Sequence, residues 1–139
     1  MQNSTWLVHE SDVFSAQWLS NHGDIRNMAT YADTVSLSHV LTSYSQIDPS
    51  LIFLLSNTTG IIRGDGLISY VIPKVANTSY IYLRQFNVIY HTIQWDTRRN
   101  ITYTYSELPI LDSTGAFINK IYSNGASEIK YRSPQSPIT

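Results

Sequence analysis

The residues best placed to bind a ligand are Asp33 and Thr34, which lie between a predicted strand and the helix predicted after it. In open α/β sheets, ligands gather at the carboxyl ends of the strands, and helix N-termini favour anions. The carboxylate of Asp33 would repel an anion, however, and no glycine-rich phosphate loop accompanies it. The pattern therefore favours Asp33 or Thr34 as a helix cap over a role in binding phosphate.

Aromatic residues outside the surest core elements offer a second candidate site. Sugars stack on aromatic faces, and the polar ends of Tyr and Trp can hydrogen-bond to them. Tyr103 and Tyr105 belong to one extended run and share a face of it. A place in the core or on the sheet is the favoured interpretation of these rings, and glycan binding is the functional alternative. The rings concerned are Trp6, Tyr90, Trp95, Tyr103 and Tyr105.

Catalytic and metal-binding patterns are weak throughout the chain. The sequence has no Cys, which excludes disulfides and thiolate metal sites. The four His residues do not have metal-site spacing, and Asp65 between two glycines lacks the other acidic ligands of a calcium loop. No Gly-x-Ser-x-Gly motif occurs, and only the fold could bring Asp112 and Glu128 together as paired carboxylates. We expect no cofactor, no metal and no catalysis by this domain alone.

Composition limits the partners and suggests a location. The 139 residues suit one domain, and a formal net charge of −1 gives no electrostatic reason to bind nucleic acid. Four Asn-X-Ser/Thr sequons, at Asn3, Asn57, Asn77 and Asn100, favour an extracytoplasmic domain. No apolar run approaches the ~20 residues that span a bilayer, and the N-terminus does not read as a signal peptide. If the domain works outside the cell, we expect another segment to bring it there.

Apolar periodicity and breaker residues predict the elements that hold these side chains. Residues 11–21 and 34–45 read as helices, the first with Trp18 and Leu19 on its apolar side. The apolar run 51–55 suits a strand covered on both faces, and Asn124-Gly125 indicates a closing hairpin with positive φ angles. Further strands are predicted at 27–31, 61–63, 67–72, 80–84, 88–95, 101–105, 120–123 and 127–132, and a short helix from Ser106.

This order of elements predicts an α/β fold: a Rossmann-like layered domain with a mixed sheet, helices packed on it and a C-terminal β-hairpin. We expect a single soluble domain over residues 1–132 and a disordered tail over 133–139, where two prolines punctuate the chain.

Four stretches together resemble a known family. The run Asp12-Val13-Phe14-Ser15-Ala16-Gln17-Trp18-Leu19 resembles the D-x-x-x-A-x-W-L helix that opens many soluble tails of polytopic sugar-transfer proteins. The runs 30–33, 80–88 and 119–125 complete the pattern, and the resemblance spans most of the chain, roughly residues 11–131. The chain is similar to the C-terminal extracytoplasmic domain of archaeal predicted multi-pass membrane proteins of unknown function, whose membrane portion looks like a polyprenyl-phosphate-sugar-dependent glycosyltransferase.

The resemblance implies a role but no catalytic residue. In related membrane glycosyltransferases the catalytic acids sit in loops of the membrane half, so it implies a non-catalytic accessory domain. Such a domain would lie on the extracytoplasmic face of the cell membrane, with the transmembrane portion of the same polypeptide as its partner, and would recognise glycan or brace the membrane part. A free-standing module that binds a glycan or another ligand, such as a sensor domain, and a small hydrolase are the alternatives.

Overall fold

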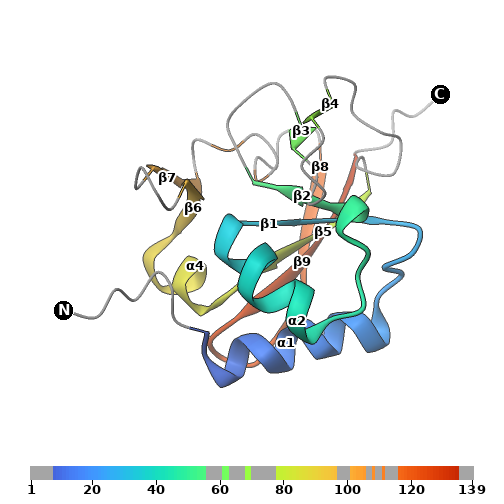
Figure 1. The fold of residues 1–139 in the computed structure, drawn as a ribbon, viewed down its shortest axis with the longest axis horizontal. Coiled ribbons are helices and arrows are strands. Elements are labelled where there is room, and N and C mark those ends of the chain that lie inside the picture. Colours follow the sequence, from blue (N-terminus) through green and yellow to red (C-terminus); the bar gives the residue numbers. More distant parts are fainter. Residues whose placement is uncertain are drawn as a thin grey trace.

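The protein is an α/β domain built on a five-stranded mixed sheet (Figure 1). The structure, a computed structural model, describes residues 8–55, 61–62, 68–69, 78–96, 101–105, 108, 111 and 116–134. The strands lie in the order β2 (Ile52–Leu54), β1 (Ala29–Ala32), β5 (Ser79–Leu83), β9 (Glu128–Pro134) and β8 (Ala116–Ser123). Strand β1 runs parallel to both β2 and β5, whereas β9 runs antiparallel to β5 and β8. The predicted α/β class and mixed sheet are therefore confirmed.

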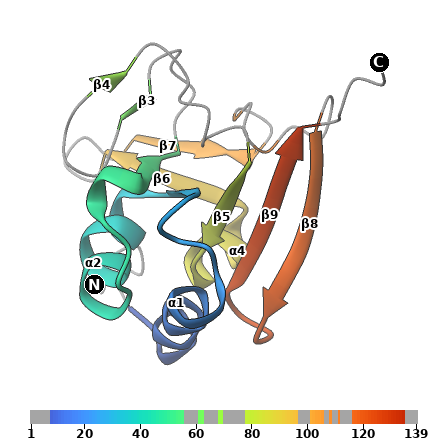
Figure 2. The same cartoon turned by 90° about the vertical axis from the view of Figure 1, so that its right-hand side faces the viewer.

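Helices cover one face of this sheet. Helix α1 (Glu10–His22) and the helix formed by a π-helical turn (Ser36–Leu41) and α2 (Thr42–Tyr44) lie on the same side (Figures 1 and 2). Leu19 is fully buried there, and Trp18 stacks on Tyr122 of β8 with 4.8 Å between the ring centroids. Trp18 and Leu19 therefore lie on the side of α1 that packs on the sheet, as the predicted apolar side requires.

A second hydrophobic cluster lies on the opposite face. In β5, Tyr80 and Tyr82 belong to the helix-side cluster, while Ile81 and Leu83 belong to the second one. Both faces of β5 are thus covered, which explains its unbroken apolar run. Strand β6 (Thr92–Asp96) contributes Ile93 to the second cluster and pairs with β7 (Ile101–Thr104). Strands β3 (Ile61–Ile62) and β4 (Ile68–Ser69) pair antiparallel with each other.

The C-terminal hairpin is present, but its turn differs from the predicted one. Within this turn Gly125 has positive φ, at 89°, whereas Asn124 does not adopt the left-handed conformation expected for it. The Oδ1 atom of Asn124 instead accepts hydrogen bonds from the backbone N–H groups of Ala126 and Ser127. A side chain that mimics a backbone turn in this way removes the need for a second positive φ.

A prediction about the segment after β5 was wrong. The strand predicted over 88–95 begins only at Thr92, because helix α4 (Gln85–Tyr90) takes up the first residues. The Oδ1 atom of Asn87 accepts the backbone N–H of Arg84 at 3.0 Å and so caps this helix, overriding the strand propensity of Val88 and Ile89. The hydroxyl of Tyr82 on β5 is buried and donates to the carbonyl of Asp12 at 2.7 Å.

Some predictions concern residues outside the described ranges. The short helix predicted from Ser106, the four sequon asparagines and residues 135–139 of the tail are among them. Strand β9 extends to Pro134, two residues beyond the predicted end of the hairpin at Arg132.

Candidate functional site

Asp33 and Arg84 meet at the carboxyl ends of two neighbouring parallel strands. Asp33 follows β1 directly, and Arg84 follows β5 directly. The chain places β2 on one side of β1 and β5 on the other, so the strand order reverses between β1 and β5. Such a switch point is where open α/β sheets bind ligands. The fold therefore puts these two residues at its most favourable ligand position.

The Asp33 carboxylate is buried and fully engaged by the protein itself. Its Oδ1 atom accepts the backbone N–H of Ser36 at 2.8 Å and the Nε–H of Arg84 at 3.3 Å. Its Oδ2 atom accepts the side-chain amide of Asn87 at 2.9 Å. Asp33 therefore caps the following helix, as the sequence favoured, and occupies the place where an external anion would bind.

Arg84 neutralises this carboxylate. Its side chain is 0% exposed, and its guanidinium carbon lies 4.7 Å from the ring centroid of Phe86. The Nη1 and Nη2 atoms have no hydrogen-bond partner in the described part of the chain. Removing either partner of this pair should be costly, because it would leave an uncompensated charge in the interior.

Asn87 connects this ion pair to the aromatic surface. Its side-chain amide donates to Asp33 and also to the carbonyl of Thr92 on β6. Its own carbonyl accepts the hydroxyl of Tyr105 at 2.8 Å. Burial, together with the negative charges of Glu128 and Asp33, raises the pKa of Tyr105. Two residues predicted separately, Asp33 and Tyr105, thus belong to one network.

Four aromatic rings lie near the hydrogen bonds of Asn87, two of them on helix α4 and two directly after α4 and β7. Phe86 and Tyr90 lie on α4 with ring centroids 5.0 Å apart, and His91 ends the helix with its ring 5.1 Å from that of Tyr105. Tyr90 is 56% exposed and His91 is exposed, while Phe86 and Tyr105 are half-buried. We call Phe86, Tyr90, His91 and Tyr105 the α4 aromatic belt.

The other predicted site residues are placed differently. Thr34 is half-buried at the start of the helix, and its carbonyl accepts the hydroxyl of Ser38. Tyr103 and Tyr105 both pack against the second hydrophobic cluster, as their shared face predicted. The backbone of Trp95 lies in β6, but its side chain and all of Trp6 lie outside the described part.

Sequence reasoning missed Arg84 and Asn87. Arg84 was assigned to the end of the strand predicted over 80–84, although a cation directly after a buried strand is itself a signal. Asn87 three residues later has the spacing of a side chain that caps a helix from its first turn. These two signals point to a capped helix after β5, but the meeting of Arg84 with Asp33 depends on the pairing of β1 with β5.

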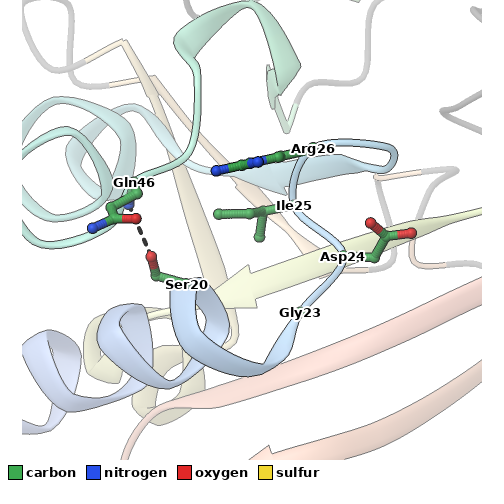
Figure 3. A pocket seen from close by; sticks show the side chains of 6 residues that line it. All are labelled: Ser20, Gly23, Asp24, Ile25, Arg26 and Gln46. Carbon is green, nitrogen blue, oxygen red and sulfur yellow. Dashed lines mark hydrogen bonds between the residues drawn. The ribbon is translucent and has the colours of Figure 1, made fainter.

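A shallow cleft lies at the opposite end of β1, where α1 ends (Figure 3). Its volume is about 270 Å³, and the hydroxyl of Ser20 accepts the backbone N–H of Gln46 across it at 3.1 Å. Asp24 and Arg26 bring opposite charges to its rim and are both exposed. Its lining is Ser20, Gly23, Asp24, Ile25, Arg26 and Gln46, of which only Ile25 is buried. A mainly polar, solvent-accessible lining of this kind lacks the buried apolar surface of a typical ligand pocket.

Metal ligands do not gather in the described residues, where no group of three or more His, Asp or Glu could hold an ion. Within the same ranges, no helix has the length and apolar character needed to cross a membrane.

Comparison of the chain with protein-family models, curated proteins and solved structures finds no match.

Proposed function

We propose that this chain is a non-catalytic extracytoplasmic accessory domain of a membrane glycosyltransferase-like protein. The observation that carries this proposal is the self-occupied switch point. Asp33, Arg84 and Asn87, all fully buried, fill the place where a Rossmann-like sheet would bind a phosphate or nucleotide. A domain that closes this position with its own charges is suited to positioning other groups rather than to performing chemistry there.

The order of the first elements supports a Rossmann-like relationship. Strand β1, a helix and parallel β2 follow one another, and the chain then returns to place β5 on the other side of β1. The antiparallel β9 and β8 extend this half-sheet. In our proposal this layered body is a rigid support beside the transmembrane portion of the same polypeptide, on the extracytoplasmic face of the membrane.

The α4 aromatic belt is the surface that we assign to glycan recognition. The exposed Tyr90 offers a ring face with a polar end, which suits the mixed apolar and hydroxyl character of a sugar. Helix α4 is fixed to the rest of the domain, because the Asn87 side chain hydrogen-bonds to Asp33 and to the Thr92 carbonyl on β6. A supported aromatic surface loses little conformational entropy when a ligand binds.

Binding to a glycan array tests this recognition role. We expect Tyr90→Ala to weaken the binding about tenfold, because the stacking lost is ~1.4 kcal/mol. Tyr44→Ala is the matched control, since Tyr44 is 43% exposed but lies on α2. Equal losses in the two variants would contradict the assignment to α4, and no binding above background would leave bracing of the membrane part as the role.

The complete reading frame tests the accessory role independently. Many transmembrane segments directly upstream of this domain would support it. A signal peptide with no other membrane segment would contradict it and favour a free-standing glycan-binding or sensor module.

A further inference from the structure

Lys130 on strand β9 lies beside the α4 aromatic belt. Its neighbours Ile129 and Tyr131 pack on the helix-covered face of the sheet, so alternation along β9 directs Lys130 to the opposite face. Tyr105 packs on that same face, and the Lys130 Nζ atom lies 6.0 Å from the centroid of its ring. The Tyr105 ring in turn lies 5.1 Å from that of His91. Lys130 therefore adds a cation to the edge of the belt.

The positive charge of Lys130 has no ion-pair partner within the described part of the chain. The carboxylate of β9 belongs to Glu128, whose Oε2 atom lies 3.2 Å from Lys120 Nζ. Lys120 lies directly opposite Lys130 in the pairing of β8 with β9. Two lysines and one glutamate thus leave an excess of positive charge here, and like charges directly opposite each other destabilise a sheet.

The surroundings of Lys130 favour an anion from outside the chain. Its side chain is half-buried, so water screens the charge less than at a fully exposed lysine. A cation–π contact of 6.0 Å is close to the limit for such contacts and uses none of the ammonium N–H donors. An anionic group bound beside Tyr105 would accept hydrogen bonds from these donors and relieve the repulsion between the two lysines.

We propose that the glycan bound by the α4 aromatic belt is acidic, and that Lys130 pairs with its carboxylate or sulfate group. This inference rests on the proposed function, because it assigns a chemical class to the glycan of that same surface. The aromatic rings suit the sugar itself, whether it is acidic or neutral. Lys130 supplies the charge complementarity that selects an acidic sugar over its neutral counterpart.

Matched pairs of glycans test this selection. In one series, an oligosaccharide that contains a uronic acid is compared with the same oligosaccharide after reduction of the carboxyl group to an alcohol. In a second series, sulfated sugars are compared with their desulfated forms. We expect the acidic member of at least one series to bind about tenfold more tightly, as a hydrogen-bonded charge pair would give. Raising the ionic strength from about 0.1 M to about 1 M should remove most of this preference, because the Debye length shortens from about 10 Å to about 3 Å.

Two substitutions at Lys130 separate its charge from its size. Lys130→Gln should abolish the preference for the acidic member, whereas Lys130→Arg keeps the cation and should retain most of the preference. Arg26→Gln is the matched control, because it removes the same charge from an exposed side chain at the other end of β1 from Asp33. This control should leave the preference unchanged.

The outcomes distinguish this inference from the proposed function. Tyr90→Ala should weaken the binding of both members of a pair, because stacking on the ring is common to them. Equal affinities for the acidic and neutral members in both series would overturn the acidic class and leave glycan recognition intact. A preference that survives in Lys130→Gln would overturn the assignment to Lys130. Absence of binding by every member would overturn the inference together with the recognition role.

Discussion

Replacing Arg84 by methionine would leave the Asp33 carboxylate buried without its cation. Both side chains are 0% exposed, and they form a salt bridge in which Arg84 Nε lies 3.3 Å from Asp33 Oδ1. Breaking a buried pair by removing one partner costs about 3–5 kcal/mol, out of roughly 5–15 kcal/mol for a whole domain. With a urea m-value of about 2 kcal/mol per M, the unfolding midpoint should fall by about 2 M.

A double-mutant cycle separates this pair from general damage to the core. Asp33→Asn leaves the Arg84 charge unpaired but retains a side chain able to cap the helix. The double variant Asp33→Asn, Arg84→Met contains neither buried charge, so its loss of unfolding free energy should be smaller than the sum of the single losses by about 2 kcal/mol.

Urea unfolding followed by tryptophan fluorescence measures all four proteins. Lys120→Met is the control, since it removes an ion pair whose lysine side chain is 53% exposed and should cost less than about 1 kcal/mol. Additive losses in the cycle, or an Arg84→Met variant as stable as the control, would refute the structural role that we assign to the pair.

Three further outcomes are expected. Burial raises the pKa of Tyr31 from 10.0 to about 12, so the folded chain retains this proton while the unfolded chain loses it. The contribution of Tyr31 to the free energy of unfolding is therefore complete below pH 10 and declines by about 1.4 kcal/mol per pH unit up to pH 12. In alkaline unfolding, Tyr31→Phe should lack this pH-dependent contribution. Gly125→Ala should lower the thermal unfolding midpoint and cost about 1–2 kcal/mol, because φ is 89° although nothing lies within 4 Å of the added Cβ. Gly23→Ala should cost a similar ~1–3 kcal/mol, because its Cβ would lie 2.8 Å from the Leu19 carbonyl oxygen, and full stability in calorimetry would contradict this packing.

Local pattern predicted the elements whose own residues decide their structure. Helix α1 and strand β5 followed from apolar periodicity and an apolar run. Helix α4 did not, because the propensities of Val88 and Ile89 favour a strand. The helix forms because the side chain of Asn87 hydrogen-bonds to Arg84, Asp33 and Thr92. The turn at Asn124 was predicted from the Asn-Gly pair, but its hydrogen bonds depend on Ala126 and Ser127.

The candidate site was predictable only in part, for the same reason. Asp33 as a helix cap follows from neighbouring residues, since its bond to Ser36 spans three positions. Its partner Arg84 is 51 residues away, and no spacing rule relates two residues that meet only because β1 and β5 are neighbours in the sheet. The link from Asn87 to Tyr105 likewise depends on how β7 ends beside α4.

A pair of titrations followed by ¹H–¹⁵N NMR tests the central claim, that the switch point is closed and the α4 aromatic belt is the open surface. Glycans that bind on the array should perturb the amides of Phe86, Tyr90 and His91. Inorganic phosphate and a nucleotide, titrated separately, should leave the amides of residues 33–36 and the Arg84 side chain unchanged. Saturable shifts at Asp33, Ser36 or Arg84 with phosphate or nucleotide would contradict the claim.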